Sequence, residues 1–398
     1  MRLTLVQDEI YLPSLGGGTK ANRFLLEGLA AEGHDCLALT RACTNSPDGP
    51  NTREQFVQEI ESRQLAVQEI DPDLFRYEFG GVQVEALDDD CLADRREHCT
   101  NRIRASKPNW VLVTDDKRRF MLASALDAAP SRVIMLLQTV VQLPFGPLSL
   151  NQSDEYTRLM ERAREIIVIS KFEQDYIRQH SNLNSVLLPI PVYGQGPFKD
   201  FSSPSDGFVT MINPCELKGV SIFLGLARRF PDVAFAAVPT WGANDDILRT
   251  LDETPNIAIL NRSDDIDEIL AKTRVLVVPS LWPETFGYVA PEAMLRGIPV
   301  LASNIGGLPE AKLDVDYLLD VVPGKWENGE FVVPSQNVDP WSSSLAELIF
   351  DANAYRRCSE ASRRAAETFV ASVSVTPFAQ LMQELSDDRT KRPDNPIH

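Results

Sequence analysis

Short apolar runs alternate along the whole chain with longer segments in which apolar residues recur at helical spacing. In the first half, a helix is expected over residues 19–34, where Leu25, Leu26 and Leu29 share a face and Gly33 supplies a stop. Strands are predicted near residues 3–7, 35–40, 109–114, 131–138 and 165–170. Continuous apolar strands separated by helices are typical of a parallel sheet with helices on both faces.

The same alternation resumes in the second half, after a segment rich in Gly, Pro and Ser. Strands are predicted near residues 208–213, 233–239, 257–261, 275–280 and 299–303. Helices are predicted over 220–230, over 265–273 and from Pro291 onward. The fold class is therefore α/β, with two Rossmann-like doubly wound domains that place their ligands at the carboxyl ends of the strands.

The domain boundaries follow from these shifts in composition. We expect an N-terminal domain over 1–193, a linker over 194–207, a C-terminal domain over 208–370, a C-terminal helix over 371–387 that packs back on the first domain, and a disordered tail over 388–398.

Residues 44–100 interrupt the alternation of the first half with a polar stretch, a helical segment and a hairpin that turns at Gly80 and Gly81. An insertion of this kind is a natural place for specificity toward an acceptor.

Charge and composition exclude several classes of function. The chain has 398 residues, of which 57 are acidic and 39 basic, and its net charge of -18 disfavours binding to nucleic acid. No apolar run is long enough to span a membrane, and the first residues do not resemble an export signal, so the cytoplasm is the expected location. The oligomeric state is left open.

The six cysteines form no CxxC and no Cys/His cluster with metal-ligand spacing, so reduced, mostly structural thiols are expected. The acidic runs at 88–90 and at Asp264 and Asp265 could suggest a metal site, but acidic loops and helix caps are the favoured interpretation.

A glycine loop, Gly16 to Gly18, follows the first predicted strand and precedes the helix that begins near Thr19. Unpaired N–H groups at a helix start favour an anion such as a diphosphate. The loop has neither the Walker pattern nor GxGxxG, and a purely structural tight turn remains an equal alternative.

The segment "PSLWPETFGYVAPEAMLRGIPVLASNIGGLPEA" at 279–311 carries two glutamates around a Gly287-centred turn. Glu292 would lie in the first turn of a helix, where the helix dipole favours a carboxylate, whereas Glu284 follows a strand directly. The segment offers what a nucleotide-sugar requires: Glu284 can accept from sugar hydroxyls, backbone N–H groups can hold phosphate, and Glu292 can bind a ribose. The N–H groups belong to Phe286, Gly287, Tyr288 and Val289.

This segment resembles the Glu-x7-Glu signature of the family 4 retaining glycosyltransferases, which have the GT-B fold of two domains facing a central cleft. The resemblance continues in "GGGTKANRFLLEGLAAEGHDCLALT", in "EIIVISKFEQDYI", and in "NPCELKG", whose Lys218 and Gly219 match the family's Lys-Gly pair. After the signature come Gly306, Gly307 and Glu310, as in the family.

The resemblance implies transfer of a hexose-type sugar from a nucleotide-diphosphate sugar, with UDP-sugars favoured, to a small-molecule, glycan or lipid-linked acceptor. It also implies that no metal or other cofactor takes part. Glu284 and Lys218 are the expected catalytic residues, and Asp115 and Gln138 are expected on the acceptor side. The expected donor-binding residues are Gly17, Gly18, Asn213, Lys218, Arg262, Phe286, Gly287, Tyr288, Val289 and Glu292.

Two positions depart from the family pattern. Asn213 stands where an arginine is common, and Gln138 stands where many members have a histidine. These departures leave open a different sugar, weaker donor binding or a non-catalytic nucleotide-sugar-binding protein. A nucleotide-sugar epimerase of the same fold is a separate alternative.

Overall fold

The computed structural model describes residues 1–14, 16–44, 49–88, 92–194, 196–327 and 329–391. The chain forms two compact units. Unit 1 contains residues 1–169, 174–192 and the segment from Val373 onward, and unit 2 contains residues 170–173 and 193–372.

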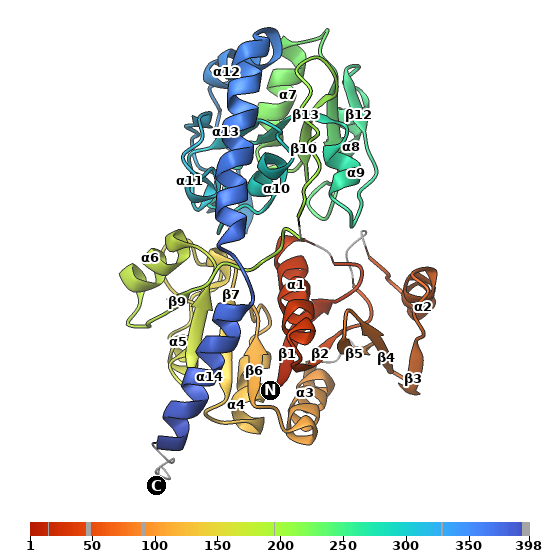
Figure 1. The fold of residues 1–398 in the computed structure, drawn as a ribbon, viewed down its shortest axis with the longest axis vertical. Coiled ribbons are helices and arrows are strands. Elements are labelled where there is room, and N and C mark those ends of the chain that lie inside the picture. Colours follow the sequence, from red (N-terminus) through yellow and green to blue (C-terminus); the bar gives the residue numbers. More distant parts are fainter. Residues whose placement is uncertain (15, 45–48, 89–91, 195, 328, 392–398) are drawn as a thin grey trace. The chain divides into compact units, whose positions relative to one another are not determined.

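The nine-stranded sheet of unit 1 has the order β3-β4-β5-β2-β1-β6-β7-β8-β9 (Figure 1). From β5 to β9 all neighbours are parallel, whereas β3, β4 and β5 form an antiparallel extension. The β4–β5 hairpin turns at Gly80 and Gly81, as predicted, and both glycines have positive φ. The strands are β1 (Arg2–Ile10), β2 (Asp35–Arg41), β3 (Gln68–Asp71), β4 (Leu74–Phe79), β5 (Val82–Leu87), β6 (Trp110–Val113), β7 (Val133–Leu137), β8 (Glu165–Val168) and β9 (Val186–Leu187).

The helices of unit 1 cover this sheet: α1 packs on β1, β2 and β5, and α4 packs on β1, β6 and β7. They are α1 (Gly17–Ala31), α2 (Arg53–Ser62), α3 (Leu92–Ser106), α4 (Met121–Ala128), α5 (Asp154–Met160), α6 (Lys171–His180), of which the first three residues belong to unit 2, and α14 (Thr376–Lys391). A 3-10 turn spans Val140–Gln142.

The last helix, α14, joins unit 1 although it follows all of unit 2 in the sequence. The indole Nε1 of Trp110, at the start of β6, donates to the Met382 carbonyl oxygen over 3.0 Å. The helix continues to Lys391, so the expectation of a disordered tail from residue 388 is wrong for 388–391. No Gly or Pro interrupts the chain there, and residues 392–398 lie outside the described part.

Unit 2 contains a six-stranded parallel sheet with the order β12-β11-β10-β13-β14-β15. Its strands are β10 (Phe208–Ile212), β11 (Phe235–Val238), β12 (Ile257–Ile259), β13 (Thr273–Val278), β14 (Val300–Ser303) and β15 (Leu318–Leu319), and a separate antiparallel pair is β16 (Lys325–Glu327) with β17 (Glu330–Val332). The central strands are buried, as their continuous apolar runs predict.

The helices of unit 2 from α7 to α11 lie between successive strands of the sheet, and α12 and α13 follow the last strand (Figure 1). They are α7 (Val220–Arg229), α8 (Asp245–Asp252), α9 (Asp267–Leu270), α10 (Val289–Leu295), α11 (Leu308–Ala311), α12 (Asp339–Phe350) and α13 (Ala352–Ala371). Residues 196–207 form no helix or strand and pack on unit 2, where Phe201 N donates to Arg296 O over 2.9 Å and Ser203 N donates to the Tyr355 hydroxyl over 3.0 Å.

Candidate functional site

In unit 2, Lys218 and Glu284 form an ion pair at the carboxyl ends of the neighbouring strands β10 and β13. Lys218 Nζ lies 2.5 Å from Glu284 Oε1, and Ser280 Oγ donates to the same oxygen, also over 2.5 Å. The Lys218 and Glu284 side chains are 20% and 12% exposed, so the pair is largely shielded yet still reachable. The structure thus brings together the two residues that the sequence marks as catalytic candidates.

Gly219 fixes the loop that carries Lys218. It is the residue directly before α7 and has φ 78°, and a Cβ atom at this position would lie 1.9 Å from the Pro279 carbonyl oxygen. Next to this contact, Leu281 N donates to Leu217 O over 2.8 Å. Because the two loops touch through their backbones, only glycine allows Lys218 to approach Glu284 so closely.

Gly306 and Gly307 support the backbone of Glu284. Gly307 N donates to Glu284 O over 2.7 Å, and a Cβ atom on Gly307 would lie 2.1 Å from Thr285 O. The Gly-Gly pair of the sequence pattern therefore has a packing role directly behind the glutamate.

The helix α10 begins at Val289, two residues earlier than the predicted start at Pro291. Pro291 fits in the first turn because an N–H at this position has no partner within the helix. Phe286 is 3% exposed, and its ring stacks on Phe369 with 5.8 Å between centroids. Its side chain is therefore core, and only its backbone could face a ligand.

Glu292 is 6% exposed in the first turn of α10, and its carbonyl oxygen accepts from Arg296 Nη1 over 3.2 Å. Burial raises the pKa of Tyr193 well above its ordinary value, and the nearby Tyr288 and Glu292 raise it further. Glu292 thus lies close to an aromatic cluster and is more deeply buried than Glu284.

Asn213 and Arg262 do not join the Lys218–Glu284 pair. Asn213 directly follows β10 with φ 58°, is 7% exposed, and accepts from Gly242 N at Oδ1 over 3.0 Å. Its side-chain oxygen therefore holds the loops after β10 and β11 together. Arg262 is exposed in the loop after β12, the strand at the edge of the sheet.

Sequence reasoning missed Ser280 and Trp282, although both lie in the conspicuous "PSLWPE" segment. Lys218 Nζ lies 5.2 Å from the centroid of the Trp282 ring, within the range of a cation–π contact. No residue of the described ranges accepts a hydrogen bond from the buried Trp282 Nε1. The sequence signal that could have identified Ser280 and Trp282 as site residues is that both lie within four positions of Glu284.

In unit 1, Gly18, Asp115 and Gln138 lie together. Gln138 N donates to Asp115 Oδ1 over 3.0 Å, and a Cβ atom on Gly18 would lie 3.8 Å from Gln138 Oε1. Gly17 is exposed at the start of α1, after Gly16 with φ 90°. Burial raises the pKa of Asp115, against hydrogen bonds from Thr139 and Gln138 that lower it.

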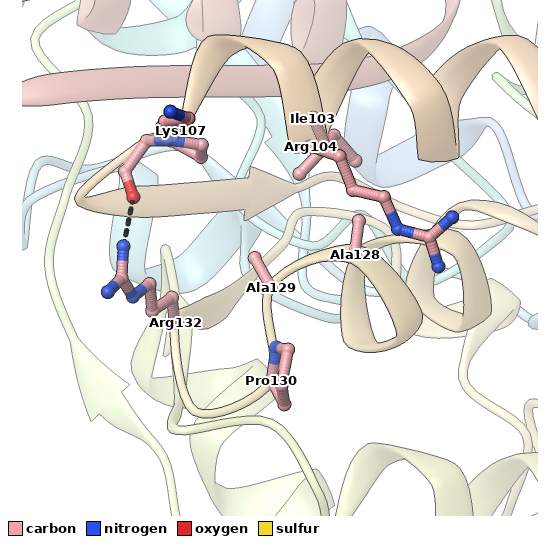
Figure 2. Close-up of a pocket in the computed structure, with 8 residues that line it drawn as sticks. Ile103, Arg104, Lys107, Ala128, Ala129, Pro130 and Arg132 are labelled. Atoms are coloured by element: carbon pink, nitrogen blue, oxygen red, sulfur yellow. Dashed lines mark hydrogen bonds between the residues drawn. The ribbon is translucent and has the colours of Figure 1, made fainter.

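A separate groove of about 400 Å³ lies at the amino ends of β6 and β7 (Figure 2). Its cations are Arg104, Lys107 and Arg132. Arg104 pairs with Asp127 over 2.8 Å and points away from Lys107 and Arg132 in Figure 2. Because the three charges do not converge, we do not regard this groove as the functional site.

Among the described residues, no three His, Cys, Asp or Glu side chains are placed to hold a metal ion. Of the acidic runs considered as metal sites, Asp89 and Asp90 lie outside the described residues. The helices in the described ranges are all too short or too polar to cross a membrane.

Comparison with known proteins identifies the relatives of this arrangement. Residues 249–365 match the family model described as "Glycosyl transferases group 1". A D-inositol 3-phosphate glycosyltransferase from Mycobacteroides abscessus is 24% identical over 219 residues, which cover 48% of this chain and 46% of that protein. The chain thus matches less than half the length of this curated relative.

Two solved structures resemble the chain over almost its full length. Sucrose-phosphate synthase from Thermosynechococcus elongatus has a TM-score of 0.67 at 17% identity and covers 98% of this chain and 99% of its own. Anabaena HepE in complex with UDP and glucose has a TM-score of 0.67 at 16% identity and covers 98% of this chain and 100% of its own. The fold is therefore GT-B, with two Rossmann-like domains.

Proposed function

We propose that the chain is a metal-independent, retaining glycosyltransferase that moves a hexose-type sugar from a nucleotide-diphosphate sugar to a small-molecule, glycan or lipid-linked acceptor. The Lys218–Glu284 pair at the carboxyl ends of β10 and β13 carries the proposal. The group 1 match over residues 249–365 supports glycosyl transfer, and the UDP held by the neighbouring HepE structure favours a UDP-sugar.

Lys218 would stabilise the departing diphosphate. Its ammonium has three N–H donors, of which one points to Glu284, so the others are available to phosphate oxygens. Negative charge develops on the leaving group in the transition state, and a fixed cation in a shielded site stabilises that charge. In this proposal Lys218 supplies the positive charge and no metal is required.

Glu284 would orient the sugar. The contacts from Lys218 and from Ser280 both fall on Oε1, so Oε2 can accept from a sugar hydroxyl. A carboxylate bound by a cation and a hydroxyl is a weaker nucleophile, which favours an orienting role over covalent catalysis.

The remaining donor contacts follow the order of the sequence. The backbone N–H groups of Gly287, Tyr288 and Val289 would bind phosphate, and Glu292 would bind the ribose hydroxyls. Gly17 and Gly18 would allow the substrate to approach the backbone, with Asp115 and Gln138 on the acceptor side.

The test begins with thermal shifts of the purified chain with UDP-, GDP-, ADP- and TDP-sugars, because a ligand of the folded state raises its apparent stability. Release of the nucleotide is then measured for Lys218→Ala, Glu292→Ala and Glu292→Gln. We expect kcat/KM to fall about 100-fold or more in Lys218→Ala and Glu292→Ala, the scale for loss of one charge-stabilising group. EDTA should not change turnover.

Arg249→Ala is the matched control, since Arg249 is 64% exposed on α8 and pairs with the nearby Asp246. Unchanged turnover in both the Lys218 and Glu292 variants would refute the site. Donor binding without turnover on any acceptor would indicate a non-catalytic binding protein, and an isomerised donor would indicate an epimerase.

A further inference from the structure

Three buried side-chain amides form a chain of hydrogen bonds in unit 1. Gln7 lies on β1, Asn22 on α1 and Gln138 after β7, and these residues are 3%, 4% and 7% exposed. Asn22 Nδ2 donates to Gln7 Oε1 over 2.9 Å, and Gln138 Nε2 donates to Asn22 Oδ1.

The backbone fixes the direction of this chain. Gln7 Nε2 lies 3.2 Å from Ile10 O and 3.4 Å from Glu9 O, and a carbonyl oxygen can only accept a hydrogen bond. Gln7 must therefore turn its oxygen toward Asn22, so Asn22 donates to it and turns its own oxygen toward Gln138. Gln138 can then only donate to Asn22, and its oxygen faces the other way.

That last oxygen is an acceptor without a donor. Gln138 Oε1 is buried and receives no hydrogen bond from any residue that the structure describes. A buried acceptor in this state is costly until a donor reaches it. Gly18 is its neighbour, and a Cβ atom at that position would lie 3.8 Å from the oxygen, an ordinary van der Waals distance.

We infer that Asn22 and Gln7 are positioning residues that make Gln138 an acceptor-only contact for a hydroxyl group of a sugar acceptor bound by unit 1. The inference rests on the proposed function, because it requires a sugar substrate. The fixed amide presents no N–H to the ligand, so the same contact disfavours a carboxylate or a phosphate at this position.

The contact is tested by measuring the affinity of the chain for glucose and for its four monodeoxy analogues. Each sugar is titrated into the chain saturated with UDP. In the wild type, one deoxyglucose should bind about tenfold more weakly than glucose, the usual scale for one hydrogen bond. In Gln138→Leu that difference should disappear, because the partner of the missing hydroxyl is gone. Glucose that binds both proteins alike, or binds neither, would overturn the inference.

Two substitutions at Asn22 separate orientation from stability. Asn22→Leu frees the Gln138 amide to turn. The affinity ratio between glucose and the deoxyglucose should therefore fall at least threefold from its wild-type value of about ten. Asn22→Asp keeps an oxygen for Gln138 Nε2 but sets another against Gln7 Oε1, so stability should fall while the difference persists. Loss of the difference in Asn22→Asp would contradict the positioning role.

Gln7→Leu serves as a second variant should Asn22→Leu fail to fold, and it should also reduce the difference. Asn101→Leu, an exposed asparagine on α3, is the control and should change nothing. UDP binding, measured in a separate titration of the same variants without glucose, reports on the proposed function separately. A chain that binds UDP but shows no dependence on Gln138 overturns this inference alone.

Discussion

The carboxyl edges of the two sheets differ in chemistry, although parallel strands form the centre of both sheets. In unit 2 this edge carries an ammonium and a carboxylate 2.5 Å apart, whereas in unit 1 it carries the linked amides of Gln7, Asn22 and Gln138, with the carboxyl group of Asp115 accepting from Gln138 N. A few loop residues thus set the chemistry of each edge. An ion pair suits a ligand whose charge changes, and a fixed amide suits a neutral hydroxyl.

The largest expected difference is in the free energy of unfolding of two variants, in each of which a glycine at the edge of one sheet is replaced by alanine. Gly219→Ala should lower the free energy of unfolding by about 3 kcal/mol or more, because the new methyl meets the Pro279 carbonyl and φ is +78°. Gly18→Ala meets only Gln138 Oε1 at 3.8 Å and should stay within about 0.5 kcal/mol of the wild type. Urea unfolding measures both. Equal destabilisation would contradict the view that the unit 1 glycine provides access rather than packing.

The next largest effect concerns the affinity for UDP. Lys218→Met should weaken UDP binding about 100-fold, or about 2.7 kcal/mol, the scale for a hydrogen bond to a charged group. Gln138→Leu should change the same affinity less than about twofold, because a neutral acceptor gives a phosphate no hydrogen bond. Isothermal titration calorimetry distinguishes the two, and similar losses in both variants would remove the assignment of the diphosphate to unit 2.

A third prediction concerns Glu27, a charged residue of unit 1 that does not belong to the amide chain. On α1, Glu27 Oε1 lies 3.3 Å from Arg23 Nε, and burial raises the pKa of Glu27 from 4.5 to about 7 in spite of Arg23. The folded state therefore binds more protons than the unfolded state between pH 4.5 and pH 7, and stability falls as the pH rises through this window.

Glu27→Gln should accordingly match the wild type near pH 4 and exceed its free energy of unfolding by about 2 kcal/mol at pH 8. Unfolding at a series of pH values measures the difference. A gain that is constant with pH would show that the carboxyl group is not the cause.

The smallest expected effect is that of salt. Raising NaCl from 0.05 to 0.5 M should weaken UDP binding roughly threefold, because ions screen a partly exposed cation. Glucose binding in the presence of saturating UDP should not change, since a hydroxyl–amide contact carries no net charge. A parallel loss for glucose would place a charge in the unit 1 contact.

Much of the fold could be predicted from the sequence because its signals are local. The apolar runs gave the central strands of both sheets, and Gly80 with Gly81 marked the hairpin turn. The proximity of Lys218 and Glu284 was also foreseeable, since each follows a strand in a parallel sheet. Their chemical roles remain predictions.

Contacts between distant segments could not be predicted in this way. Asn22 and Gln138 are 116 residues apart, and their contact joins α1 to the residue that follows β7. Ser280 lies only four residues from Glu284, but its hydroxyl reaches the carboxylate because of the turn after β13. The extension of α14 beyond residue 387 escaped because the polar sequence there carries no helical periodicity.

The return of the chain to unit 1 after Ser372 has a consequence for assembly and engineering. Tyr193 and Phe369, near the first and last residues of the long segment of unit 2, have ring centroids only 5.9 Å apart. Residues 193–372 therefore form a continuous segment whose two ends lie close together. Such a segment is suited to being exchanged as a whole between related proteins. During synthesis, the hydrogen bond from the Trp110 indole can form only after Met382 has been added. Unit 1 is therefore begun first and completed last.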